Sequence, residues 1–118
     1  MSQTNEDAVR TYYTAIDAEE YDTVFALFDE SIIYERPGQE SIRSIDALKD
    51  FYLNHRPLSD GSHKIHSLTS DGETVAVRGT FSGTQADTDV SFGFADFFVF
   101  GEDGLIKRRC TYTDRDTV

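Results

Sequence analysis

The sequence predicts an α+β fold in which helices pack on one face of a curved antiparallel sheet. In the first half of the chain, apolar residues recur at the spacing of amphipathic helices, and in the second half they alternate at the spacing of strands. The length of 118 residues is typical of one domain with one hydrophobic core. We therefore expect residues 1–118 to form a single domain.

Three helices and one short strand are expected before the main strands of the sheet. Asp22 and Ser44 are of the residue types that cap helix N-termini, and Pro37-Gly38 and Pro57 are breakers. The expected segments are a helix over Glu6–Ala18, a helix that begins at Asp22 and ends before Asp29, a strand over Ser31–Arg36, and a helix from Ser44 to Pro57.

The rest of the chain has the pattern of an antiparallel meander. Turns are expected at Asp71-Gly72, around Gln85–Thr88 and at Gly101–Gly104. The expected strands are His63–Ser70, Thr74–Gly83, Val90–Phe100 and Leu105–Thr113.

The strand Val90–Phe100 is apolar on both faces, because residues two apart share one side of a strand. One face carries four phenylalanines and Asp96, and we expect it to cover the helices. The other face carries Ala95, Phe97 and Val99, and a second copy of the chain would cover it. We therefore predict a homodimer, and the alternative is a core strand with no partner.

The chain is acidic, with 22 Asp and Glu against 11 Lys and Arg and a formal net charge of -11. Such a charge repels phosphate backbones and anionic lipids, so we predict that the protein binds neither nucleic acid nor membranes. The single cysteine allows no internal disulfide, and we expect a cytoplasmic protein. The many Asp and few Lys residues are typical of halophile-like proteins, and the alternative is an ordinary acidic bacterial protein.

Asp96 is the candidate site residue to which the strand pattern itself points, because it shares a face with phenylalanines. Burial among aromatic rings favours a neutral acid that can donate a hydrogen bond, whereas a neighbouring arginine favours the ionised form. Arg109 is expected across from Asp96 on the next strand. Two interpretations stay open: a residue of a functional pocket, or one half of a structural ion pair.

Several segments in this order resemble the nuclear-transport-factor-2-like superfamily and its ketosteroid-isomerase-like and polyketide-cyclase-like (SnoaL-like) branch. They are the tyrosine-rich first helix, Tyr34–Gly38, Phe51-Tyr52, Phe94–Phe98 and Gly104–Ile106, and they span nearly the whole chain. The resemblance implies a cone-shaped fold, in which a curved antiparallel sheet wraps around N-terminal helices and encloses a pocket, and it usually implies dimers. It does not fix a reaction, because this fold hosts isomerases, cyclases, epoxide hydrolases, dehydratases and domains without catalysis.

The resemblance also implies roles for particular residues. Tyr12 and Asp96 match the positions that hydrogen-bond the substrate oxygen. The carboxylate that moves the proton in that branch is replaced by Arg36, which cannot accept a proton and would instead bind a carboxylate or enolate oxygen. The alternative for Arg36 is an exposed ion pair. The other expected substrate contacts are Tyr34 at the mouth of the pocket, with Phe92, Phe94, Phe98 and Arg109.

The general base is left without a matching residue, and His66 or Glu35 are the candidates. For His66 the alternative is a surface histidine. His55, His63 and His66 are of the residue type that binds zinc, and His63 and His66 have His-x-x-His spacing. Residues three apart on a strand face opposite sides, however, so we expect no metal. The sequence implies no cofactor.

The sequence therefore predicts a pocket for a small, mainly apolar organic molecule that carries a carbonyl or hydroxyl group. If the protein is an enzyme, the reaction class is proton transfer, such as isomerisation, cyclisation or dehydration. The alternative is a module that binds a ligand or dimerises without catalysis.

Overall fold

The computed structural model describes residues 4–36, 38–55, 58–85 and 87–114. It contains the helices α1 (Asn5–Asp17), α2 (Tyr21–Ala26) and α3 (Ile45–Asp50), and α3 continues into a π-helical turn, η1 (Phe51–His55). The strands are β1 (Phe28–Glu35), β2 (Ile42–Arg43), β3 (Leu58–Asp71), β4 (Thr74–Gln85), β5 (Thr88–Phe100) and β6 (Ile106–Thr113). The predicted α+β fold class is confirmed.

Within these residues the strands form one six-stranded sheet in the order β2-β1-β6-β5-β4-β3. The meander from β3 to β6 is antiparallel, as expected. The sheet as a whole is mixed rather than antiparallel, because β1 runs parallel to β6. Between β1 and β6 the chain passes through β2, α3, η1 and the three antiparallel strands β3, β4 and β5. Such a long connection lets two strands lie side by side in the same direction.

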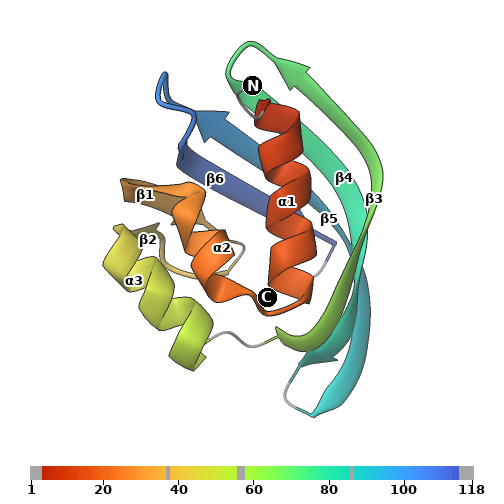
Figure 1. Cartoon of the computed structure of the whole chain (residues 1–118). Coiled ribbons are helices and arrows are strands. Elements are labelled where there is room, and N and C mark those ends of the chain that lie inside the picture. Colours follow the sequence, from red (N-terminus) through yellow and green to blue (C-terminus); the bar gives the residue numbers. More distant parts are fainter. Residues whose placement is uncertain (1–3, 37, 56–57, 86, 115–118) are drawn as a thin grey trace.

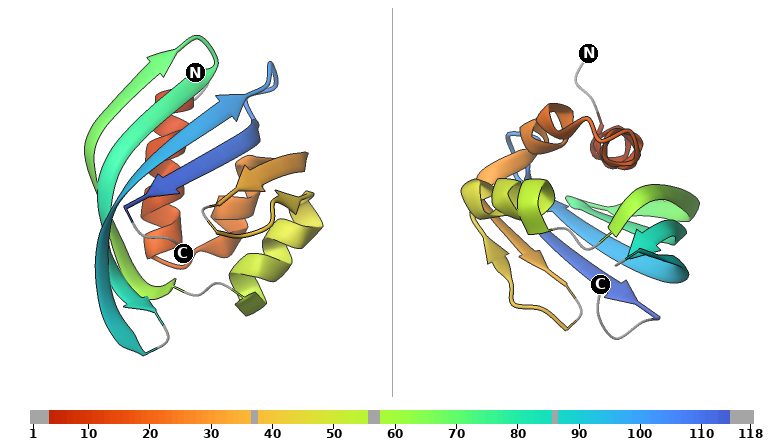
Figure 2. Two further views of the ribbon diagram at one scale, coloured as in Figure 1. Left: turned by 180° about the vertical axis from the view of Figure 1, so that it is seen from behind. Right: turned by 90° about the horizontal axis from the view of Figure 1, so that it is seen from below.

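The long strands β3 and β4 bend around helix α1, which lies on the concave side of the sheet (Figure 1). Strand β3 contains two register shifts against β4, between Ser59 and Ser62 and between Ile65 and Ser67. Bulges of this kind increase strand twist and bend the sheet. The view from below shows α1 over one side of the curved sheet, with α2 and α3 beside β1 and β2 (Figure 2). The result is the expected cone.

Helix α1 begins where the sequence supplies a cap and buries the face that its periodicity predicts. The Thr4 hydroxyl accepts a hydrogen bond from the backbone N–H of Asp7 at 3.1 Å. Val9, Tyr12, Tyr13 and Ile16 are buried. Tyr12 and Tyr13 pack against the Phe98 ring of β5. The inner residues of β5, which are Phe92, Phe94, Asp96, Phe98 and Phe100, are all buried, as predicted.

Some predicted boundaries are wrong. The second helix begins at Tyr21 rather than Asp22 and ends at Ala26, because Phe28 pairs with Ile106 and starts β1. Tertiary pairing has here overridden the local helical pattern. Strand β2 was not expected, and β3 begins at Leu58. The predicted breakers Pro37 and Pro57, and Ala86 in the predicted Gln85–Thr88 loop, lie outside the described residues.

In the described part of the chain, no helix is long and apolar enough to cross a membrane.

Gly79 on β4 lies where its neighbours leave no room for a side chain. A Cβ atom at this position would meet the backbone carbonyl oxygen of Lys64 and, at 2.7 Å, the ring of Phe94. We expect Gly79→Ala to lower the free energy of unfolding by about 1–3 kcal/mol, as overpacking does in protein interiors. Urea unfolding measures it. Gly93→Ala is the control, because its Cβ would meet the exposed Asp114 side chain at 3.3 Å and backbone only at 3.9 Å, the carbonyl oxygen of Gly79. An equal loss in both variants would contradict the expectation.

Candidate functional site

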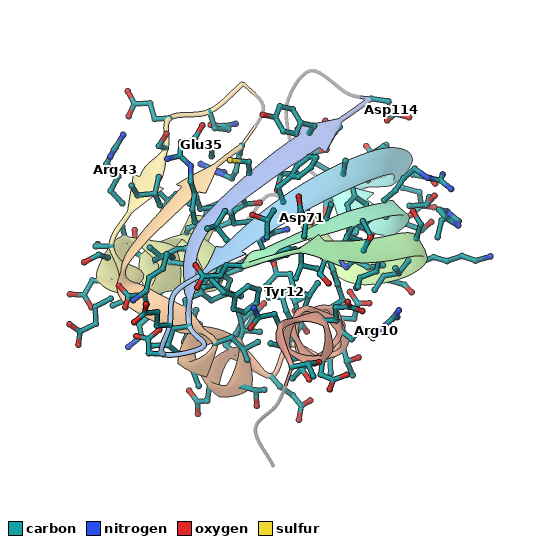
Figure 3. All side chains as sticks on the ribbon, turned by 90° about the horizontal axis from the view of Figure 1, so that it is seen from above. Arg10, Tyr12, Glu35, Arg43, Asp71 and Asp114 are labelled. Carbon is teal, nitrogen blue, oxygen red and sulfur yellow. The ribbon has the colours of Figure 1, made fainter. Side chains whose placement is uncertain are left out.

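A cavity of about 50 Å³ lies between α1, the turn η1 and the inner face of the sheet. Most of its wall is aromatic, formed by Tyr12, Tyr34, Phe51, Tyr52, Phe81, Phe92 and Phe94. Its polar side chains are Arg36, His63, Asp96, Arg109, Thr111 and Thr113. A water needs about 10–15 Å³ of such space, so the cavity holds a few waters or a small part of a ligand. Tyr12 lies between α1 and the sheet, whereas Glu35 and Arg43 lie on the side of β1 and β2 (Figure 3).

A buried ion pair, Asp96 on β5 with Arg109 on β6, forms one wall of the cavity. The guanidinium donates to both carboxylate oxygens, from Nε to Oδ1 at 3.2 Å and from Nη2 to Oδ2 at 3.0 Å. The predicted register is wrong by two residues, because Arg109 lies opposite Phe98 and Thr111 lies opposite Asp96. A register shift between Val99 and Phe100 accompanies this difference, and Arg109 reaches Asp96 from the diagonal position.

The Asp96 carboxylate accepts two further hydrogen bonds, from the hydroxyls of Tyr13 and Thr111. Both of its oxygens are therefore occupied by donors. A fully buried carboxylate is stable as an ion only when it is paired and hydrogen-bonded in this way. Asp96 is thus one half of a satisfied ion pair, and it still contributes to the cavity wall.

Arg109 extends the network to two tyrosine hydroxyls. Its Nη1 donates to Tyr12 at 2.5 Å and to Tyr52 at 3.1 Å, and these two hydroxyls are 2.6 Å apart. The guanidinium also lies over the ring of Tyr34, 4.5 Å from its centre. Burial is the largest single effect on Arg109 and opposes its charge. The Asp96 carboxylate and the tyrosines Tyr12, Tyr34 and Tyr52 together outweigh burial, so the pKa of Arg109 is raised above its usual value.

Tyr12, Tyr13 and Tyr34 keep their protons. Burial raises the pKa of Tyr12 and Tyr13 well above the usual value, although Arg109 acts in the opposite direction. Burial also raises the pKa of Tyr34 to about 12. Their hydroxyls therefore remain neutral over the physiological range, and a neutral hydroxyl can donate a hydrogen bond to a ligand oxygen.

Arg36 lies at the cavity on the same side as Tyr34, as predicted. Its guanidinium carbon is 4.3 Å from the centre of the Phe51 ring, a cation–π contact. Its Nε is buried and has no hydrogen-bond partner among the described residues. Burial lowers the pKa of Arg36, but arginine stays charged at physiological pH. Glu35 faces away and pairs with Arg108.

The prediction of His66 as a pocket acid or base is wrong. Its side chain is exposed and its Nε2 lies 2.8 Å from the Thr80 hydroxyl, outside the cavity. The register shift between Ile65 and Ser67 falls at this residue and changes which side chains point inward. His63 lines the cavity instead, with its Nδ1 2.5 Å from Asp17 Oδ1.

The aromatic residues predicted to contact a ligand do not all line the cavity. Phe92 and Phe94 line the cavity, whereas Phe98 packs behind Tyr12, with ring centres 5.7 Å apart, and does not line it. Adjacent residues of a helix project about 100° apart. Of the two adjacent tyrosines only Tyr12 lines the cavity, yet Tyr13 reaches the same polar network by donating to Asp96.

Sequence reasoning missed Tyr13, Tyr52, Thr111, Asp17 and His63 as parts of the site. The Phe51-Tyr52 pair was the available signal for Tyr52. No pattern in the sequence indicates that His63 contacts Asp17, which lies 46 positions earlier. Among the described residues, no group of three or more His, Cys, Asp and Glu side chains is placed to hold a metal ion, and the side chain of His55 lies outside that part.

Comparisons with known proteins agree with this architecture. The family model of the SnoaL-like domain matches residues 9–109. An LEH-like epoxide hydrolase of M. tuberculosis is 25% identical with a TM-score of 0.82, over 93% of this chain and 82% of that one. A nuclear-transport-factor-2-like protein of unknown function from Burkholderia pseudomallei is 17% identical with a TM-score of 0.86, over 96% and 92%.

A third similar structure is an epoxide hydrolase/cyclase-like enzyme with a role in pyran ring formation in the polyether salinomycin. It is 19% identical with a TM-score of 0.82, over 92% of this chain and 89% of that one. No curated protein matches the sequence. These structures confirm the cone-shaped fold.

The buried ion pair leads to a stability prediction. Asp96→Asn keeps the shape of the side chain but leaves the Arg109 charge buried without its counter-ion, so we expect the free energy of unfolding to fall by about 3–5 kcal/mol. Asp103→Asn is the control, because it removes only an exposed ion pair with Lys107 and should leave the urea midpoint unchanged. Equal midpoints for Asp96→Asn and wild type would show that the pair does not hold the core together.

Proposed function

This chain belongs to the SnoaL-like domain family, and we propose that its cavity binds a small, mainly apolar organic molecule through a carbonyl or hydroxyl oxygen and acts on it by proton transfer. Isomerisation, cyclisation and dehydration are the reaction types within this class. The observation that carries the proposal is the Tyr12 hydroxyl, held by Arg109 in the wall of an aromatic cavity. Two similar structures are named for epoxide hydrolysis and ring formation, which supports small-molecule chemistry.

Tyr12 is the residue that would contact the ligand oxygen. Its hydroxyl accepts a hydrogen bond from Arg109, and when Tyr52 donates to it as well, its own proton is left for the ligand. A negative charge that develops on the ligand oxygen would meet a donor polarised by a buried guanidinium. Donors fixed in a site that excludes water stabilise such a charge far better than water does. Asp96 then acts as a positioning residue, because its oxygens already hold Arg109.

Arg36 would contact a second, anionic oxygen of the ligand, such as a carboxylate or enolate. The support is a charged guanidinium at the cavity that stacks on Phe51 and keeps a buried Nε without a partner in the described part of the chain. A carboxylate is the group that matches the donor geometry of arginine.

The alternative is a module that binds such a molecule without catalysis. It is favoured by Arg36, which stands where the resemblance implies a proton-accepting carboxylate. It is also favoured by Glu35 and His66, since both candidate bases face away from the cavity.

Isomerisation of the β,γ-unsaturated isomer of cyclohexenone separates these proposals, because this ketone is small and the reaction is self-contained. A proton leaves the carbon beside the carbonyl, the electrons form a dienolate, and a proton returns to the far end of the double bond. The conjugated product is followed by ultraviolet absorbance. We expect the wild type to accelerate the reaction and Tyr12→Phe to lower kcat by about 100-fold, the effect of removing one oxyanion donor.

Tyr21→Phe is the matched control, because it removes a hydroxyl whose 3.5 Å contact with Glu19 is exposed. Circular dichroism verifies that each variant is folded. Acceleration that survives Tyr12→Phe would refute the role of Tyr12. Binding of the ketone, measured by NMR shifts of cavity residues, without any acceleration would establish the non-catalytic alternative.

We also propose a homodimer through the outer face of the sheet. Phe97 and Tyr112 are 40% and 61% exposed there, and their rings meet edge to face at 5.9 Å. Large aromatic side chains grouped on a surface are typical of an interface, and a two-fold partner would bury both.

Light scattering tests the dimer. We expect the wild type to have twice the 13.3 kDa mass of the chain. Phe97→Glu should give the single-chain mass, because a two-fold axis brings the new charges close together. Leu53→Glu is the control, since Leu53 is also exposed but lies on η1. A wild type of single-chain mass at micromolar concentration would contradict the proposal.

A further inference from the structure

Asp17 and His63 make two hydrogen bonds with each other at the edge of the cavity. His63 Nδ1 lies 2.5 Å from Asp17 Oδ1, and the backbone N–H of His63 donates to Asp17 Oδ2 at 2.8 Å. The His63 side chain is only 9% exposed, and it lines the same cavity as Tyr12 and Arg36. One residue of β3 thus occupies both oxygens of the carboxylate.

This contact fixes which nitrogen of the ring carries the proton. An ionised carboxylate only accepts hydrogen bonds, so Nδ1 of a neutral His63 must be the protonated nitrogen, and Nε2 carries the lone pair. Among the described residues, no hydrogen bond to Nε2 is formed. The rings of Tyr13, Phe81 and Phe94 surround the imidazole at centre distances of 5.1, 4.9 and 5.4 Å. A proton acceptor is therefore held in a fixed orientation at the cavity.

The position of Asp17 in α1 indicates that this carboxylate is there for its contact with His63 and not to stabilise the helix. Asp17 is the last residue of α1, and no basic residue lies in the last turn. A carboxylate at a helix C-terminus is disfavoured by the helix dipole. The hydrogen bonds to His63 offset this disadvantage, and the dipole also favours any positive charge that the imidazole acquires on accepting a proton.

We infer that His63 is the general base of this cavity and that Asp17 is its positioning residue. The inference rests on the proposed function. In the isomerisation described above, Nε2 takes the proton from the carbon beside the carbonyl, while the electrons move to the oxygen at Tyr12. The imidazolium, stabilised by Asp17, then returns the proton to the far carbon. The ring ends as it began, and no other reactant is needed.

Two histidines of the same strand provide a matched pair of variants. His63→Gln keeps a donor for Asp17 but has no basic nitrogen, and we expect kcat to fall by at least about 100-fold, the usual contribution of a general base. His66→Gln makes the same change on the exposed side of the sheet and should keep wild-type activity. Asp17→Asn should lower kcat with little change in KM, because its amide would turn the ring to the tautomer with hydrogen on Nε2.

Nitrogen NMR of isotope-labelled wild-type protein gives a measurement that does not depend on turnover. In the wild type we expect a hydrogen on Nδ1 of His63, where the Asp17 carboxylate accepts it. In Asp17→Asn the hydrogen should move to Nε2. If the Asp17–His63 contact served only to hold α1 against β3, folded His63→Gln and Asp17→Asn would keep the wild-type kcat.

The outcomes separate this inference from the proposed function. Wild-type turnover that persists in folded His63→Gln would overturn the inference and leave the proposed function standing. A wild type without turnover would refute isomerisation of this ketone. The NMR measurement would then test whether His63 is placed to accept a proton from a ligand. A neutral ring whose Nε2 signal shifts on addition of the ketone would support the inference, and a ring protonated on both nitrogens, or indifferent to the ketone, would overturn it.

Discussion

The buried Asp96–Arg109 ion pair is the constraint on which the rest of the structure depends. Two opposite charges in an aromatic core are tolerated only if each remaining donor and acceptor finds a partner. Here the partners are hydroxyls of Tyr12 and Tyr13 from α1, Tyr52 from η1 and Thr111 from β6. These bonds tie the helices to the sheet and form a polar wall in a mainly aromatic cavity.

The two arginines of the cavity differ in what surrounds them. Arg109 is matched by Asp96 and two tyrosine hydroxyls, whereas Arg36 has an aromatic ring beneath it and an unpartnered buried Nε within the described residues. A satisfied cation fixes geometry, and an unsatisfied cation is available to a ligand. This difference, rather than the presence of either arginine alone, supports an anionic oxygen on the proposed ligand.

The sequence predicted the inner face of β5 and the inward face of α1, because both depend on local periodicity. It failed where a single-residue irregularity changes a face or a register. The shift beside His66 in β3 accompanies an inward His63. The shift after Val99 in β5 accounts for one of the two residues by which the register at Asp96 differs from the prediction, and the position of the turn accounts for the other. Local sequence patterns also cannot predict the parallel pairing of β1 with β6, because these two strands are far apart in the sequence.

Helix α1 joins the two halves of the proposed chemistry. Tyr13 and Asp17 are four residues apart and therefore share one face of the helix. The Tyr13 hydroxyl bonds Asp96 in the polar wall, and its ring lies 5.1 Å from the His63 ring that Asp17 orients. A shift of α1 along the sheet would thus disturb both Tyr12, the proposed contact of the ligand oxygen, and His63, the proposed proton acceptor. Tyr13 does not line the cavity, yet it contacts both groups, Asp96 through its hydroxyl and His63 through its ring.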